Sequence, residues 1–185
     1  MTEVYLIRHG ESEANAAEFL DISSDTYIFD AELTPKGKMQ AKATANKLNH
    51  IEFDLIVSSP LSRALQTYEI IFSKRDIKLD INPLHREYVA HSCDIGIQPA
   101  DLKKKFPNLN FKKLEKYWWN NGKKIQENKI FIESISNLNL RVKKFKKFIK
   151  NRNEKRIAVI GHGTFYSKII GYLLNNCEYK VIKNN

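Results

Sequence analysis

Residues 4–10 read VYLIRHG, an apolar run that passes directly into Arg8-His9-Gly10. The β-branched, aromatic and aliphatic side chains predict a buried strand over residues 3–8. Arginine and histidine are poor core residues, but both are suited to holding a phosphate. Because a three-residue string often arises by chance, its meaning depends on whether later segments supply a second histidine, a second arginine and a proton donor.

Two later apolar runs pass into polar residues in the same way. Residues 55–57 predict a buried strand that leads into Ser58-Ser59-Pro60, with Arg63 shortly after it. Residues 156–160 predict another strand, which leads into Gly161-His162-Gly163. Short strands are also predicted at residues 79–81 and 178–182.

Helices are predicted between these strands. Thr34-Pro35 forms a helix start, with threonine as N-cap and proline at the first helical position. The clearest amphipathic pattern places Ile135, Leu138, Val142, Phe145 and Ile149 on one face, with lysines on the other. The expected helices cover residues 34–49, 61–72, 134–151 and 164–174, with a helical turn at 12–18.

Strands that alternate with helices predict an α/β fold, here a three-layer α/β/α sandwich with a largely parallel sheet. We expect one domain over residues 1–185, with residues 88–132 as a small, inserted, cap-like helical segment. Trp118 and Trp119 in that segment favour a core role. Ligands bind such folds at the carboxyl ends of the strands, so the three polar strand ends are expected to meet in one site.

The composition is that of a globular domain, with 42% hydrophobic and 28% charged residues. No apolar run approaches the roughly 20 residues of a membrane span, and no secretory signal pattern is present. Cys93 and Cys177 lack metal-ligand spacing, which disfavours a zinc site or a disulfide framework. We therefore expect a cytoplasmic protein.

The positive charge is concentrated in one segment. Residues 101–156 hold 18 Lys and Arg residues against 5 Asp and Glu residues, whereas the whole chain holds 31 and 21. A solvated lysine-rich face is the favoured interpretation, and attraction of an anionic substrate, nucleic acid or membrane is the alternative. No pattern of basic and aromatic residues resembles a known nucleic-acid module, so no specific nucleic-acid binding is expected.

Taken together, the motifs resemble those of the histidine phosphatase superfamily, the phosphoglycerate-mutase-like proteins. They occur in the family's order over nearly the whole chain. The matching segments are Leu6–Ser12 with Asn15, Leu33–Gly37 with Gln40-Ala41, Ser58–Thr67, Glu87, and Gly161–Gly163. The resemblance implies the phosphoglycerate-mutase-like fold and a phosphohistidine intermediate.

The chemistry of the residues agrees with that resemblance. Arg8 and Arg63 can each grip phosphate oxygens with a planar fork of donors, and His162 can add another donor. His9 is the candidate nucleophile, provided that its attacking nitrogen is unprotonated. Gly10 and Gly163 would leave room for the backbone near the phosphate. Since the arginines supply the positive charge, no metal and no cofactor are expected.

The remaining site assignments depend more on the resemblance. Asn15 resembles a family asparagine that reaches the phosphate, although a local capping role fits it almost as well. Glu87 matches the family's general acid, with Asp94 and Glu11 as alternatives. Its carboxyl pKa should be raised so that the acid form persists near neutral pH. His50, His85 and His91 are interpreted as structural or surface residues.

The predicted function is metal-independent hydrolysis of phosphomonoesters. Hydrolysis is favoured over mutase-type phosphoryl transfer because the chain is short beside a typical cofactor-dependent mutase and residues 88–132 bear little resemblance to a mutase lid. Mutase-type transfer is the alternative. A third possibility is a catalytically weak phosphate-binding regulatory module. The expected partner is a small phosphorylated metabolite or phosphopeptide. If the inserted lysines border the pocket, substrates with several anionic groups are favoured; these lysines are Lys103, Lys104, Lys105, Lys112 and Lys113.

Overall fold

A five-stranded sheet forms the centre of the molecule, in the order β3-β2-β4-β1-β5. The computed structural model describes residues 2–18, 25–124 and 132–184. The strands β1 to β4 run parallel, and β5 pairs antiparallel with β1 at one edge, so the predicted largely parallel sheet is confirmed. The strands are β1 (Thr2–Arg8), β2 (Leu55–Ser58), β3 (Leu79–Ile81), β4 (Arg156–Gly161) and β5 (Tyr179–Asn184).

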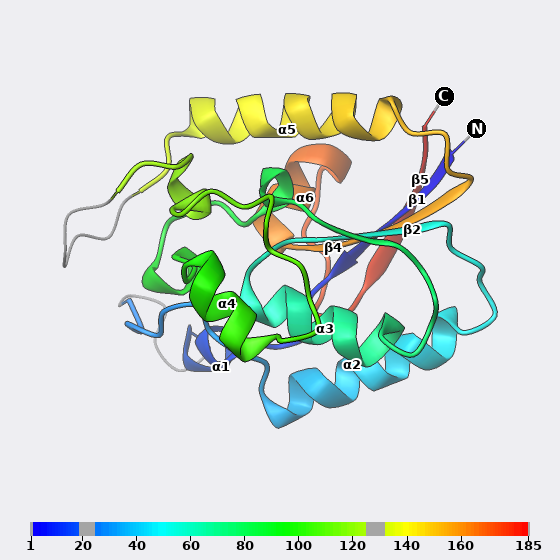
Figure 1. Ribbon diagram of the computed structural model, residues 1–185, viewed down its shortest axis with the longest axis horizontal. Helices are drawn as coiled ribbons and strands as arrows, with labels where there is room; N and C mark the ends of the chain where they lie inside the picture. The colour runs from blue at the N-terminus through cyan, green and yellow to red at the C-terminus, as the bar shows by residue number, and fades with distance from the viewer. Residues whose placement is uncertain (1, 19–24, 125–131, 185) are drawn as a thin grey trace.

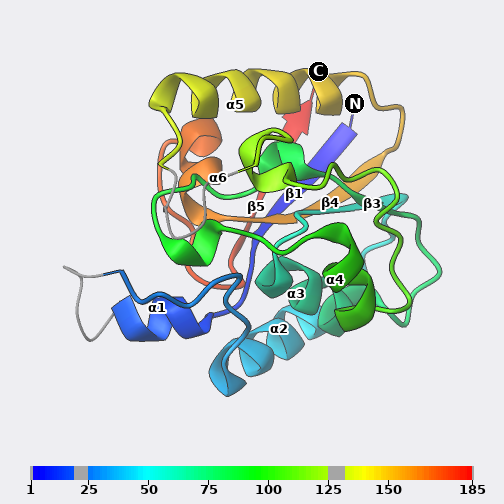
Figure 2. The ribbon, with the colours of Figure 1, turned by 60° about the vertical axis from the view of Figure 1, so that its left-hand side comes forward.

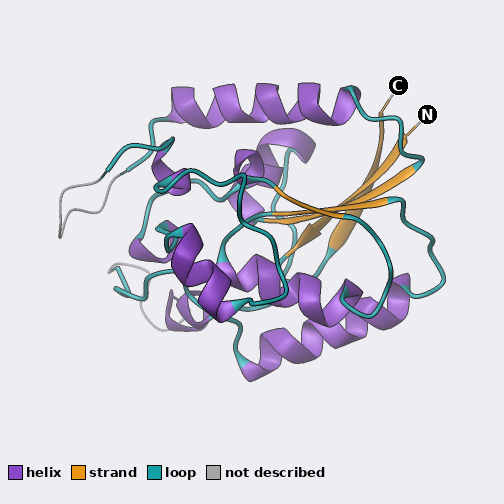
Figure 3. Ribbon diagram, in the orientation of Figure 1, coloured by secondary structure: helices purple, strands orange, loops and turns teal. Residues whose placement is uncertain are grey.

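Helices cover both faces of this sheet (Figures 1 and 3), which confirms the three-layer sandwich. Successive side chains of a strand point to opposite faces. Tyr5 and Ile7 of β1 therefore pack in the core shared with α2 and α3, whereas Val4 and Leu6 pack in the core shared with α5 and α6. The helices are α1 (Glu13–Glu18), α2 (Pro35–Leu48), α3 (Ser62–Phe72), α4 (Pro99–Lys105), α5 (Ile135–Lys150) and α6 (Gly163–Ile170).

Two helices begin close to the predicted positions, and Thr34 is the predicted N-cap of the first. The Thr34 hydroxyl accepts a hydrogen bond from the Gly37 amide at 3.0 Å, and the Ser134 hydroxyl accepts one from the Asn137 amide at 3.2 Å. Each cap satisfies an amide that has no partner within its helix. None of the described helices is long and apolar enough to cross a lipid bilayer.

The last helix is shorter than predicted. The sequence pattern extends it to Leu174, but α6 ends at Ile170 because Gly171 adopts a left-handed conformation with φ of 87°. Glycine takes this conformation without steric strain and commonly terminates helices. The chain then turns back, and the carbonyl of Leu174 accepts a hydrogen bond from Arg8 Nη1 at 2.7 Å.

The segment 88–132 has less helix than its predicted character suggests. Its described part contains α4 and two short 3₁₀ helices, Ser92–Asp94 and Trp118–Asn120, joined by irregular loops. Trp118 and Trp119 are buried in the core on the α2 and α3 side, as predicted. Figure 2 shows α4 beside α3. The aromatic side chains Phe106 and Phe111 of the segment belong to the same buried core. The predicted single domain over residues 1–185 stays a prediction.

The Trp118 indole leaves no room for a side chain at position 96. A Cβ atom at Gly96 would lie 2.1 Å from Trp118 Cζ2. We expect Gly96→Ala to destabilise the protein by about 1–3 kcal/mol, as overpacking of a filled core does. Denaturant unfolding measures this loss. In a Trp118→Phe background the clashing ring atoms are absent, so the same substitution should be nearly neutral there. Equal losses in both backgrounds would contradict this packing argument.

Candidate active site

The carboxyl ends of β1, β2 and β4 surround one pocket of about 390 Å³. Arg8 is the last residue of β1 and His9 follows it, Arg63 lies in the first turn of α3 after β2, and Gly163 begins α6 after β4. Glu87 completes this group from the loop after β3. The structure thus brings together residues that lie up to about 155 positions apart in the sequence, at the edge where the topology predicts a ligand site.

The His9 ring has a defined tautomer. Its Nδ1 lies 2.6 Å from the Gly10 carbonyl oxygen, which can only accept, so Nδ1 carries the proton. Its Nε2 accepts a hydrogen bond from Arg63 Nε at 3.2 Å, so Nε2 presents a lone pair. Burial, together with the charges of Arg63 and Arg8, holds the pKa of His9 well below its usual value. His9 is therefore neutral at physiological pH.

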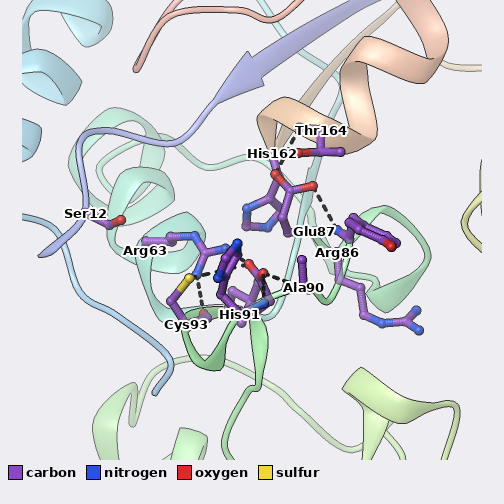
Figure 4. A network of polar contacts seen from close by, with 12 residues as sticks. Ser12, Arg63, Arg86, Glu87, Ala90, His91, Cys93, His162 and Thr164 are labelled. Atoms are coloured by element: carbon purple, nitrogen blue, oxygen red, sulfur yellow. Dashed lines mark hydrogen bonds and ion pairs between the residues drawn. The ribbon is translucent and has the colours of Figure 1, made fainter. Parts of the chain in front are cut away.

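The Arg63 guanidinium is held on three sides. Besides the bond to His9, its Nη1 donates to the Cys93 carbonyl at 2.6 Å and its Nη2 donates to Asp94 Oδ1 at 2.9 Å. Figure 4 shows this guanidinium directed toward the segment that carries His91 and Cys93. Burial is the largest influence on the pKa of Arg63 and lowers it, but the surrounding charges, that of Asp94 first, together outweigh burial, and the net shift is upward. Arg63 stays charged and fixed.

His162 lies behind His9, with the ring centroids 5.1 Å apart. It is fully buried and is not among the side chains that line the pocket, and its role as a phosphate ligand stays a prediction. Its Nε2 forms a hydrogen bond of 2.8 Å with the Ser59 hydroxyl, whereas its Nδ1 has no hydrogen-bond partner in the described part of the chain. Burial and the charge of Arg63 hold the pKa of His162 well below its usual value.

The supporting polar residues have mixed roles. Asn15 lines the pocket, as a residue that reaches the phosphate would. Its Oδ1 also accepts a hydrogen bond from the Ser12 amide at 3.4 Å, as a local cap would. A Cβ at Gly10 would lie 2.5 Å from the Gly37 carbonyl oxygen, so the absence of a side chain at Gly10 lets the first turn of α2 pack against it. A Cβ at Gly163 would lie 3.2 Å from Arg8 Nε, which agrees with a close approach beside the pocket.

Glu87 is held by backbone amides. Its Oε1 accepts from the Tyr88 and Phe165 amides, and its Oε2 accepts from the Thr164 amide at 3.0 Å. Figure 4 shows Glu87 beside His162 and next to Thr164. Burial raises the pKa of this carboxyl, the Asp94 charge raises it further, and the backbone hydrogen bonds and Arg63 oppose both. The net shift is upward, in the direction that the sequence led us to expect.

The two alternative acids are engaged elsewhere. Asp94 lines the pocket, but it is ion-paired with Arg63 at 2.9 Å and its Oδ2 accepts from the Ala90 and His91 amides. Glu11 pairs with Lys36 at 2.6 Å, and this hydrogen bond lowers the pKa of its carboxyl. Glu11 is not among the pocket-lining residues. Glu87 is therefore the carboxyl whose surroundings best favour a retained proton.

Two of the histidines interpreted as structural differ from each other. His85 is buried, and its Nε2 donates to the Ile160 carbonyl at 3.0 Å, as a structural histidine would. Burial lowers the pKa of His85 to about 3. His91, in contrast, lines the pocket. No partner spacing in the sequence singles out His91, and nothing in the sequence shows which way its loop faces.

The lysines expected to select substrates with several anionic groups lie outside the pocket around His9. None of Lys103, Lys104, Lys105, Lys112 and Lys113 lines the pocket around His9. Lys105 pairs with Glu32 at 2.6 Å, and Lys104 pairs with Asp101 at 2.9 Å. Within the described part of the segment, residues 88–94 are the ones that reach the pocket, and Asp94 is their one acidic side chain. These lysines do not line the site to which the prediction assigned them, and the preference for multi-anionic substrates stays a prediction.

No group of three or more His, Cys, Asp or Glu side chains within residues 2–18, 25–124 and 132–184 has the geometry to hold a metal ion. The metal-free reaction, the absence of a cofactor and the cytoplasmic location stay predictions. What the pocket offers is two arginines and a neutral histidine beside a carboxyl, at the strand ends of an α/β sheet. This arrangement suits the binding of a phosphoryl group.

Comparison with known proteins assigns the family. The model of the histidine phosphatase superfamily (branch 1) matches residues 4–182, and the chain belongs to this superfamily. The phosphoglycerate mutase-like protein 1 of Arabidopsis thaliana is 27% identical over 220 residues, which are 97% of this chain and 74% of that protein. The phosphoserine phosphatase 1 of Hydrogenobacter thermophilus is 26% identical over 204 residues, 98% of this chain and 86% of that protein.

A solved structure supports the fold independently. The alpha-ribazole phosphatase from Shigella flexneri superposes with a TM-score of 0.67 at 21% identity, and the match covers 100% of this chain and 91% of that chain. Some other relatives match this chain over less than half of their own length. The relatives thus include both phosphatases and mutase-like proteins, and the fold is that of the superfamily.

Proposed function

We propose that this protein hydrolyses phosphomonoesters without a metal, through a phosphohistidine at His9 Nε2, with Glu87 as general acid. The observation that carries this proposal is the His9 tautomer. With Nδ1–H fixed on the Gly10 carbonyl, the Nε2 lone pair faces two arginines that can hold a phosphoryl group. A neutral, oriented imidazole is what nucleophilic attack on phosphorus needs.

In the first step, Arg8 and Arg63 grip the phosphoryl oxygens. The Arg63 Nε–H, which donates to His9 Nε2 in the free protein, transfers its hydrogen bond to a phosphoryl oxygen and so frees the lone pair. The Nε2–P bond then forms as the bond from phosphorus to the ester oxygen breaks. The guanidinium charges stabilise the equatorial oxygens in the transition state.

Glu87 gives its proton to the departing ester oxygen, which leaves as an alcohol. We assign this proton to Oε2, because Oε1 already accepts two backbone hydrogen bonds and Oε2 accepts one. Water then attacks phosphorus, and the Glu87 carboxylate takes up its proton. The Nε2–P bond breaks with its electron pair returning to His9, and orthophosphate is released. The sum of the two steps is ester plus water giving alcohol plus phosphate.

A panel of phosphorylated metabolites tests this proposal, with phosphoglycerate isomerisation measured in parallel. We expect orthophosphate release from simple phosphomonoesters, in the presence of a chelator. Isomerisation that outpaces hydrolysis would instead establish the mutase. Binding without turnover would establish a regulatory module, and strict dependence on an added divalent metal would contradict the metal-free mechanism.

Asp94 provides a pH-dependent test of the acid. Its charge is the second cause, after burial, of the raised Glu87 pKa. In Asp94→Asn the Glu87 pKa should fall, so Glu87 loses its proton at a lower pH. Since the acid must be protonated, the alkaline limb of the kcat profile should move to lower pH, while activity on the acid side is better retained. Steady-state rates on an alkyl phosphate across pH measure this shift.

The matched control is Asp101→Asn, which removes an exposed carboxylate of α4 that pairs only with Lys104 in the described residues. Its profile should coincide with that of the unaltered protein. If Asp94 were itself the acid, Asp94→Asn would lower the rate at every pH and would spare only substrates with good leaving groups.

A further inference from the structure

A second pocket, of about 480 Å³, lies outside the site around His9. Four basic side chains line it, and the one acidic residue among its lining is Glu115; the basic residues are Arg86, Lys113, Arg141 and Lys144. We call it the Arg86–Arg141 pocket. It shares no lining residue with the pocket around His9. Figure 4 shows the Arg86 side chain directed away from His162 and Arg63.

The floor of this pocket holds an excess of buried positive charge. Arg86 and Arg141 are 3% and 4% exposed. Within the described residues, the one carboxylate that forms ion pairs with them is Glu133, which is 1% exposed. Glu133 binds Arg141 through both of its oxygens, but lies 3.6 Å from Arg86. Two buried guanidinium groups thus share one carboxylate. A buried charge without its own partner is unfavourable, and a bound anion would relieve it.

Arg86 also has unused donors. Its three hydrogen bonds go to the carbonyls of Trp119 and Pro83 and to Asn121 Oδ1. A guanidinium has five N–H groups, so two of them have no hydrogen bond within the described part of the chain. Burial and the Arg141 charge lower the pKa of Arg86 to about 9, which reflects the incomplete compensation by Glu133.

Two exposed lysines stand at the edge of the same pocket. Lys113 comes from the inserted segment and its side chain is 87% exposed, with its closest carboxylate, Asp80, at 4.0 Å. Lys144 comes from the exposed face of α5. Lys113 is one of the lysines expected to select substrate at the active site. Its position relates the basic segment to the Arg86–Arg141 pocket instead.

We propose that the Arg86–Arg141 pocket is a second binding site, which takes a small metabolite with at least two neighbouring phosphate or carboxylate groups. One anionic group meets the unused Arg86 donors on the floor, and the other meets Lys113 and Lys144 at the rim. The volume lies within the range of small-molecule sites. This site requires no turnover at His9, so it stands apart from the proposed function.

The pocket also lies directly behind the general-acid segment. Arg141 Nη1 donates to the carbonyls of Leu84 and Arg86, both at 2.9 Å, and its Nη2 donates to the Glu87 carbonyl at 3.2 Å. The guanidinium that lines the Arg86–Arg141 pocket therefore holds the backbone on which Glu87 is mounted. A ligand in this pocket acts next to the active site without entering it.

Calorimetric titration with methylenediphosphonate, which a phosphatase cannot hydrolyse, tests the proposal. The unaltered protein should bind two molecules. In Lys113→Ala/Lys144→Ala, one site should weaken about tenfold or more, because two charge-assisted contacts are lost. In Arg63→Ala the other site should weaken, and binding to the Arg86–Arg141 pocket should remain. Citrate in a parallel titration distinguishes a carboxylate ligand from a phosphate ligand.

The matched control is Lys112→Ala/Lys143→Ala, which removes two exposed lysines of the same segment and helix that do not line the pocket. It should bind as the unaltered protein does at the same ionic strength. Binding that Lys113→Ala/Lys144→Ala leaves unchanged, or equal weakening in both lysine pairs, would overturn the proposal, whereas a single site that only Lys113→Ala/Lys144→Ala weakens would still support it. Hydrolysis of an aryl phosphate should be unchanged in Lys113→Ala/Lys144→Ala, so this result is read separately from the test of the proposed function.

Discussion

His9→Ala is expected to lower the hydrolysis of every phosphomonoester by more than about 10⁴-fold. The loss should not depend on the leaving group, because His9 forms the bond to phosphorus in the first step of each turnover. Its neighbours keep their contacts, since Arg63 retains its bonds to the Cys93 carbonyl and to Asp94. The variant should therefore still bind a phosphate mimic such as tungstate while it fails to turn over.

The covalent intermediate gives a second readout of the same variant. Rapid acid-free quenching of the unaltered protein with a ³²P-labelled ester should trap label on the chain, stable in base and labile in acid, as a phosphohistidine is. His9→Ala should trap none. His50→Ala is the control, because His50 is exposed and lies at the end of α2, away from the pocket. It should label and turn over normally.

Two results would contradict the role of His9. Turnover in His9→Ala near that of the unaltered protein would exclude nucleophilic catalysis by this residue. Base-stable labelling that persists in His9→Ala would place the phosphoryl group on another side chain. His9 makes a hydrogen bond inside the protein, so its removal could disturb the fold. Thermal unfolding of the variant shows whether the fold is retained.

The sequence predicted the strands and their polar ends well, because each is a local signal. Val4 to Ile7 is apolar on both faces, as a central strand buried by helices on each side must be. The amphipathic repeat from Ile135 to Ile149 placed α5 within a residue of its observed bounds. Pattern alone extended α6 too far, since Gly171 adopts a left-handed conformation that an apolar count does not detect.

The sequence predicted which residues form the site, but not which hydrogen bonds hold them there. Arg8, His9 and Arg63 each follow a strand end, so the topology alone brings them together. The partners of Arg63 come from a loop around Asp94, and no local pattern shows which way that loop faces. The same limit applies to the lysines. Charge density in the sequence identifies a basic segment, but only packing shows that Lys113 faces a different pocket.

Glu87→Gln is expected to slow the hydrolysis of alkyl phosphates by about 10²–10⁴-fold, the usual worth of a general acid. An alkoxide is a poor leaving group and needs the proton as its bond to phosphorus breaks. p-Nitrophenyl phosphate, whose leaving group is stable as an anion, should lose less than about tenfold. The ratio of the two losses, measured as kcat/KM, reports proton donation rather than a general loss of structure.

The amide of glutamine fits the site imperfectly, which gives a structural check on this result. Its oxygen can take the place of Oε1 and accept from the Tyr88 and Phe165 amides. Its nitrogen would then face the Thr164 amide, where Oε2 accepts a hydrogen bond in the unaltered protein. One hydrogen bond at the start of α6 is lost, and we expect about 1–3 kcal/mol lower stability. Denaturant unfolding measures this loss.

Glu52→Gln, which alters an exposed carboxylate, is the control and should change neither substrate. Equal losses on the alkyl and aryl phosphates in Glu87→Gln would mean that the carboxyl only organises α6, and the acid would then have to be sought at Asp94. Because Asp94 is held by Arg63 and two backbone amides, its protonation would break an ion pair that also orients the phosphate-binding guanidinium. Protonation of Glu87 is opposed mainly by backbone hydrogen bonds, and burial already favours it.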